Sequence, residues 1–129
     1  MSKGRKISMM EQIKQHTSIR KYQHKPIPQQ VMDNIFTAIQ MAPSWINGQQ
    51  YSVIRVTDQG AREKLAVLAG NQKYIADAAE FLVFCADFNR FSKWCRCRQA
   101  EPGYDNPISF LNAMQDTLLV TQNFCTLAE

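Results

Sequence analysis

F-L-V-F-C, at residues 81–85, is a short continuous apolar run that is typical of a strand buried on both faces. Y-S-V-I-R-V-T, at residues 51–57, alternates in polarity and is rich in β-branched and aromatic residues, which predicts a strand before it. Asp58 comes next, in the position of a helix cap. A two-stranded sheet is marginal by itself, and no other segment has so clear a strand pattern.

Apolar residues at three-to-four spacing predict helices in much of the remaining sequence. Gly70 and Asn71 occupy the usual stop position of one helix, in which Leu65 and Leu68 are expected to face the core. Residues 87–106 are polar, aromatic and irregular, and we expect them to form a long surface excursion. The predicted helices cover residues 9–15, 28–41, 62–68, 75–80 and 106–129.

The last predicted helix starts well but has no stop signal. Asn106 and Pro107 form a good cap and first turn, whereas no Gly, Asn or Pro precedes Glu129 at the end. We therefore expect residues 1–129 to be a single partial domain. Either a second polypeptide completes its core, or it is the front part of a longer protein cut inside a helix.

Composition is that of one ordinary soluble domain: 129 residues, 45% hydrophobic and 20% charged. No apolar run approaches the roughly 18 to 20 residues that span a bilayer, and the basic start lacks the apolar region of a signal peptide. These features predict a cytoplasmic protein without a membrane partner. Four cysteines are too few for a disulfide scaffold, which fits a reducing compartment.

The net charge of +4 is concentrated near the N-terminus. Residues 1–25 hold seven Lys and Arg side chains against a single acidic one, Glu11. Such a segment fits a nucleic acid, a membrane surface, the phosphate of a small ligand, or a solvated helix face. Charge alone does not choose among them.

H-T-S-I-R, at residues 16–20, is a candidate anion site. Arg20 has a planar fork of donors suited to phosphate, Thr17 and Ser18 add hydroxyl donors, and His16 can add one more. The alternative is a solvated loop with a capping serine.

Two further segments concentrate polar side chains. A-P-S-W-I-N-G-Q-Q-Y, at residues 42–51, carries short amides that can reach the edge of a planar heterocycle, with Trp45 as an apolar wall. G-N-Q-K-Y, at residues 70–74, places three polar residues at a helix end facing the same cleft. The alternatives are turn chemistry around a buried Trp and an ordinary helix stop.

In this order and at these separations, the three segments resemble the FMN-dependent nitroreductase family, especially its NADPH-preferring flavin reductase branch. The resemblance also includes A-E-F-L-V-F-C-A-D-F-N-R, and it covers roughly residues 10–90 and again 116–129. It implies an α+β fold with helices on a small mixed sheet, here truncated, and an intertwined homodimer whose two FMN sites are built from both subunits. It also implies that NAD(P)H passes hydride to FMN, and that reduced FMN passes electrons to nitroaromatics, quinones or free flavin.

The resemblance implies three groups of FMN-binding residues and no catalytic side chain, because the cofactor carries the reaction. The first group would hold the phosphate and ribityl chain, the second would approach the ring from the same chain or from the partner subunit, and the third would contact the ring's polar edge. In that order, the groups are His16, Thr17, Ser18 and Arg20; Pro43, Ser44 and Asn47; and Gln72 with Lys73 or Asn71.

The sequence also admits three other interpretations: a metal or redox site, a nucleic-acid-binding module and an inactive family remnant. Cys95 and Cys97 could suggest a metal or redox site, but the C-x-C spacing has no accompanying ligands, so no metal is expected. A basic nucleic-acid-binding module would explain the charge, yet interleaved aromatics and a recognised module are missing, so no nucleic-acid partner is expected. An inactive family remnant with exposed core surface follows from truncation.

Overall fold

The computed structural model describes residues 8–23, 25–103 and 106–129. The basic side chains of Lys3, Arg5 and Lys6, which carry part of the predicted N-terminal charge, lie outside the described residues. The elements in chain order are α1 (Met9–Gln15), α2 (Gln29–Ile39), the 3-10 turn η1 (Trp45–Asn47), β1 (Tyr51–Arg55), α3 (Gln59–Leu68), α4 (Tyr74–Asp77), β2 (Leu82–Ala86), α5 (Phe88–Cys97) and α6 (Pro107–Ala128).

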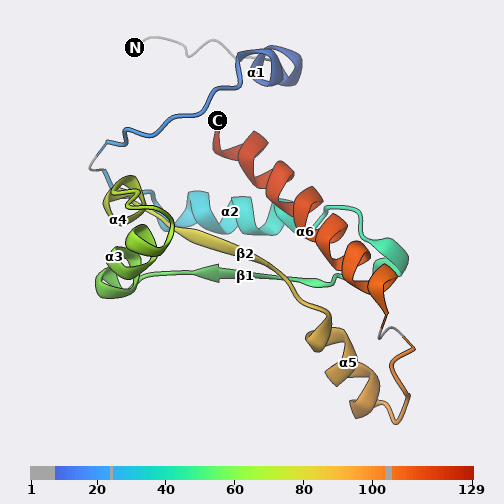
Figure 1. Ribbon diagram of the computed structural model, residues 1–129. Coiled ribbons are helices and arrows are strands. Elements are labelled where there is room, and N and C mark those ends of the chain that lie inside the picture. Colours follow the sequence, from blue (N-terminus) through green and yellow to red (C-terminus); the bar gives the residue numbers. More distant parts are fainter. Residues whose placement is uncertain (1–7, 24, 104–105) are drawn as a thin grey trace.

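A two-stranded sheet and two helices form the centre of the molecule (Figure 1). The strands β1 and β2 pair antiparallel, with Val53 opposite Phe84, and α6 packs on both strands and on α2. The α3–α4 pair lies at one end of the sheet and α5 at the other (Figure 1). The most deeply buried apolar residues come from α2 and α6, and they include Met32, Ile39, Ala113 and Val120.

Local signals set several helix ends as the sequence predicts. The Asp58 carboxylate accepts a hydrogen bond from the Ala61 N–H at 2.7 Å, and Asn106 Oδ1 accepts one from the Ser109 N–H at 3.0 Å. Both side chains pair a backbone donor that has no partner within its helix. After α3 the backbone turns through Gly70 and Asn71, whose φ angles of 88° and 59° are left-handed.

Three expectations are wrong, and a fourth holds only in part. Residues 88–97 form α5 rather than an irregular excursion, because Asp87 caps the helix and its aromatic residues recur at helical spacing. The strand β2 is half-buried along its whole length, since α6 covers it while a second covering layer is missing from the described residues. Leu68 is 82% exposed at the end of α3. The expected α+β fold is present, but the sheet in this chain is antiparallel, not mixed.

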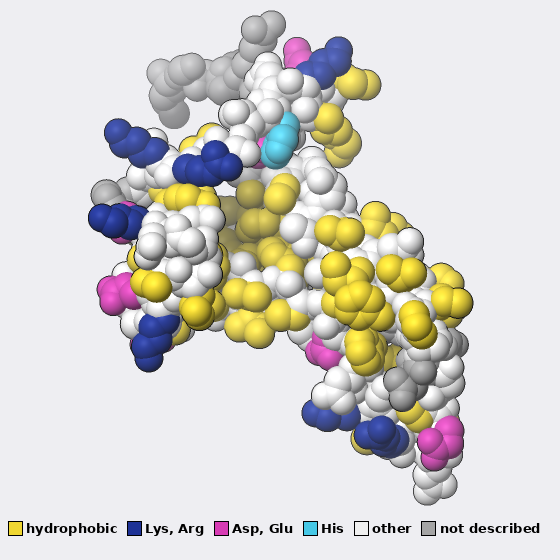
Figure 2. Space-filling view, viewed as in Figure 1, with side chains coloured by type: hydrophobic (Ala, Val, Ile, Leu, Met, Phe, Trp, Pro, Cys, Tyr) yellow, Lys and Arg dark blue, Asp and Glu magenta, His cyan; other side chains and the backbone are white. Residues whose placement is uncertain are grey.

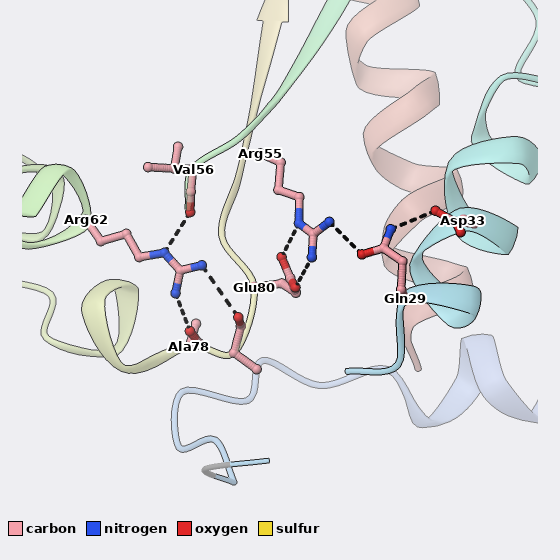
Figure 3. A network of polar contacts seen from close by, with 8 residues as sticks. Gln29, Asp33, Arg55, Val56, Arg62, Ala78 and Glu80 are labelled. Atoms are coloured by element: carbon pink, nitrogen blue, oxygen red, sulfur yellow. Dashed lines mark hydrogen bonds and ion pairs between the residues drawn. The ribbon is translucent and has the colours of Figure 1, made fainter. Parts of the chain in front are cut away.

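Arg62 attaches the α3–α4 pair to the end of the sheet. Its guanidinium is buried and donates hydrogen bonds to the carbonyls of Val56 and Ala78, both at 2.7 Å (Figure 3). These carbonyls end β1 and α4, so a single side chain pairs acceptors that the backbone leaves open. The turn between α3 and α4 therefore keeps a fixed position relative to the sheet.

A second network joins β1, the segment before β2 and α2. Arg55 donates to both carboxylate oxygens of Glu80, and also to Gln29, which in turn donates to Asp33 at 2.7 Å (Figure 3). The hydrogen bonds from Arg55 lower the pKa of the largely buried Glu80 below its ordinary value.

We expect this network to make folding stability fall in acid. The pKa of Glu80 is lowered in the folded chain, so the stabilisation is present above the unfolded value near 4.5 and is lost as pH falls through the folded pKa. Urea unfolding between pH 3 and pH 7 measures this. Glu80→Gln should flatten the acid limb of the profile, whereas Glu101→Gln, at an exposed position, should leave it unchanged; equal profiles would contradict the assignment.

Asp116 is a buried carboxylate in the core, at 2% exposure. Its carboxylate accepts hydrogen bonds from two backbone N–H groups, those of Trp45 at 3.0 Å and Gln50 at 3.1 Å. Asp116→Ala should therefore destabilise the fold by roughly 2 to 4 kcal/mol, because both donors lose their acceptor. Urea titration followed by circular dichroism measures the loss. Asp77→Ala, at an exposed position, is the matched control, and a similar cost for both variants would show that the anchor is dispensable.

Candidate functional site

The first predicted group, residues 16–20, follows α1 at the C-terminal end of α6. The Gln12 amide donates to the Thr126 carbonyl, and His16 Nδ1 contacts the Glu129 carboxylate. These two contacts hold the short helix, whose own residues are not buried. They also commit one ring nitrogen of His16 to a carboxylate, which leaves Nε2 as the nitrogen that can face a ligand.

The remaining polar residues of this group are exposed: Thr17, Ser18 and Arg20. Within the described part of the chain they make no hydrogen bond or ion pair. Two hydroxyls and a guanidinium with unused donors match the predicted anion site in chemistry.

One aromatic contact joins the segment that follows the first group to the turn that carries the third group. Tyr22, just after the anion-site segment, packs edge-on against Tyr74 with the ring centroids 6.4 Å apart. The Tyr74 hydroxyl donates to the Gln72 side-chain oxygen, which leaves the Gln72 amide N–H groups available. Lys73 and Asn71 are exposed on the same turn. The structure therefore links these two groups through a tyrosine pair.

The second predicted group lies on a tightly folded loop before β1. Ser44 Oγ accepts a hydrogen bond from the Gln49 N–H at 3.0 Å, and Asn47 Oδ1 accepts one from the Gln49 amide at 3.2 Å. These hydrogen bonds within the loop are the turn interactions that the alternative interpretation expects. It still leaves the Ser44 hydroxyl proton and the Asn47 amide N–H groups free to face a ligand.

The loop contains unusual backbone for its residues. Ile46, Asn47 and Gln49 all have φ angles between 48° and 56°, in the left-handed region. For a β-branched residue such as Ile46 this conformation is strained and persists only where the surroundings impose it. Asp116 supplies that constraint through its two hydrogen bonds to the loop.

The structure does not bring the loop group to the other two. Asp116 anchors the loop, while the first group contacts Thr126 and Glu129 at the end of the same helix. Twelve residues of helix separate Asp116 from Ala128, a distance of about 18 Å. The loop that carries Pro43, Ser44 and Asn47 is therefore held at the middle of α6, whereas the segment after α1 lies at the C-terminal end of that helix (Figure 1).

Sequence reasoning missed the residues that position these segments, Asp116 and Arg62. Each is a charged residue within a helix, and each is buried in the structure. Asp116 gave a usable signal, because an acid within an apolar stripe needs a partner when buried. Arg62 gave none, since its carbonyl acceptors lie 6 and 16 residues away in sequence.

The two cysteines of the C-x-C pair differ in burial. Cys95 is buried on α5 and Cys97 is exposed, and both are free thiols. Among the described residues, no cluster of three potential metal ligands occurs. The helices within those residues are also too short or too polar to cross a membrane.

Comparison with known proteins covers nearly the whole chain. The sequence profile described as "Nitroreductase family" matches residues 13–129. An oxygen-insensitive NADPH nitroreductase of Salmonella typhimurium is 40% identical over 88% of this chain and 46% of its own length. An FMN reductase [NAD(P)H] of Bacillus subtilis is 48% identical over 64% of the chain and 33% of its own length.

Solved structures of similar proteins have the same fold as this chain. The NADPH:FMN oxidoreductase from Vibrio harveyi, solved in complex with NAD+, superposes with a TM-score of 0.86 at 36% identity, over 93% of this chain and 50% of that one. The chain thus spans about half the length, or less, of these relatives. The profile match, the sequence identities and the shared fold together show that this chain belongs to the nitroreductase family.

Proposed function

We propose that this chain takes part in FMN-dependent electron transfer from NAD(P)H to small acceptors such as nitroaromatics, quinones or free flavin. The observation that carries the proposal is the set of unused donors at Thr17, Ser18 and Arg20, on a segment that the Tyr22–Tyr74 contact joins to the turn of Gln72. The names of the Salmonella and Bacillus relatives support the same chemistry.

The donor set fits the phosphate end of FMN. Arg20 would pair with the phosphate, and the Thr17 and Ser18 hydroxyls would donate to its oxygens and to the ribityl chain. His16 would donate through Nε2, because Nδ1 faces Glu129. Gln72 would present its amide N–H groups, with Lys73 close by, to the polar edge of the ring. Bound FMN would supply the hydride and electron transfer.

The site requires a second subunit in this proposal. Pro43, Ser44 and Asn47 lie on the loop that Asp116 holds, about 18 Å along α6 from the helix end that contacts the first group, so one chain does not present all three groups to one flavin. In a homodimer all three groups would surround one flavin, because the two-fold axis would bring the loop of one subunit to the anion site of the other. Each of the two sites then contains the first and third groups of one chain and the second group of its partner.

The surface of α6 supports a partner at this place. Figure 2 shows hydrophobic side chains gathered along that helix. Close to the Asp116 anchor, the buried amides of Gln50 and Asn112 have atoms without a hydrogen-bond partner among the described residues. The most exposed apolar residues of α6 are Ile108 (66%), Leu118 (62%), Leu111 (57%) and Phe110 (51%). A surface of this kind marks an interaction site.

FMN binding tests the proposal directly. The purified chain mixed with FMN should retain a bound-flavin absorption spectrum after gel filtration, and the spectrum should bleach when NADPH is added. Arg20→Ala should weaken FMN affinity by about ten- to a hundredfold, because it removes charge-assisted hydrogen bonds to the phosphate. Arg96→Ala, at an exposed position on α5, should not weaken it. A folded chain that takes up no FMN would overturn the proposal.

A mixing experiment tests the two-subunit site. Arg20→Ala and Asn47→Gly each damage every site of their own homodimer, and Gly keeps the left-handed backbone of Asn47. Unfolding and refolding the two variants together gives mixed dimers in which one site carries both changes and the other none. FMN binding should then recover to about a quarter of the wild-type sites. Recovery no greater than the sum of the separate variants would mean that both groups act within one chain.

A further inference from the structure

A groove of about 520 Å³ lies between the loop before β1 and α5. Its walls include Asn47 on the loop and Arg90, Phe91 and Trp94 on α5. The two aromatic rings lie 6.0 Å apart between centroids and are inclined by 33°, so they form one continuous apolar wall. This volume is in the range of small-molecule sites. None of the four residues belongs to the phosphate-binding segment.

Arg90 gives the groove a positive charge. Its guanidinium makes one long hydrogen bond, 3.4 Å to the Tyr51 carbonyl, and no ion pair with a described residue. The nearby Asp87 carboxylate is engaged elsewhere, by the Ser52 hydroxyl at 2.5 Å and the Arg90 backbone N–H at 3.1 Å. Among the described residues, therefore, most of the Arg90 guanidinium donors have no acceptor.

Two further features favour an aromatic anion. Arg98 lies 5.6 Å from the centroid of the Trp94 ring, which adds positive charge beside the apolar wall. The opposite wall is the strained turn at Ile46 and Asn47, whose left-handed backbone is held from within by Asp116. Strained backbone is frequent at ligand sites, where the surroundings fix a wall in advance of binding.

We propose that this groove binds flat aromatic anions, with the ring against Phe91 and Trp94 and the anionic group on Arg90. Because Asn47 also belongs to the proposed flavin site, such an anion would be the electron acceptor where its ring carries a nitro group, which takes up two electrons and two protons to give a nitroso group and water. Nitroaromatic carboxylates are therefore the favoured substrates. That role rests on the proposed function. Binding itself does not, because the groove is formed by this chain alone and needs no flavin.

The test uses two probes of the same shape, 4-nitrobenzoate and the uncharged 4-nitrobenzamide. Equilibrium dialysis against the 129-residue chain without FMN measures both affinities. The benzoate should bind about tenfold more tightly than the amide. Arg90→Gln should remove that difference in affinity and leave the affinity for the amide unchanged. Lys93→Gln removes the same charge from the same helix outside the groove, and it should preserve the difference. Trp94→Ala should weaken both probes.

Three results would overturn the proposal. Equal affinity of the wild-type chain for both probes would exclude a charge-selective site. If Arg90→Gln and Lys93→Gln reduced the preference for the benzoate equally, the preference would come from the overall positive charge of α5 rather than from a contact with Arg90. Absence of binding by a chain with a native circular dichroism spectrum would exclude the groove altogether. Because FMN uptake is measured separately, failure here leaves the flavin proposal standing, and failure of FMN uptake leaves this one standing.

Discussion

The carboxylate of Asp116 accepts hydrogen bonds from two backbone N–H groups that precede it by 71 and 66 residues. A buried carboxylate is costly unless its oxygens are paired, and these two donors pair one oxygen each. The same bonds fix the loop at residues 45–50 against α6. They thereby set where β1 begins, hold Ile46 in a strained conformation, and place Asn47 and the groove wall. Removing this one group would loosen all of these features together.

The helix α6 organises the site as well as the core. One side packs on α2 and on both strands, and it carries Ala113 and Val120, which are almost fully buried. Its middle holds the loop through Asp116, and its end contacts the segment at His16. Another side exposes large apolar residues such as Leu118. One helix therefore holds two of the three proposed groups of flavin-binding residues and exposes large apolar side chains on another side.

Local sequence signals were reliable where a helix ends through its own residues. Asp58 and Asn106 cap their helices, and Gly70 with Asn71 ends α3, because each effect depends on neighbours within a few residues. The expectation for residues 87–106 failed because loop-forming composition outweighed a real amphipathic pattern. In the structure, Asp87 begins α5 and Cys95 turns inward.

The sequence by itself determined the family, both strands, the helices other than α5, and the residues whose chemistry suits a phosphate and a flavin ring. Those properties depend on residue type and spacing, which the chain displays directly. Only the tertiary structure decided that His16 faces Glu129, that the loop at Asn47 is held at the middle of α6, and that Arg62 and Asp116 hold these parts in place. Contacts between residues 60 to more than 100 positions apart depend on how elements pack, and no local pattern encodes that packing.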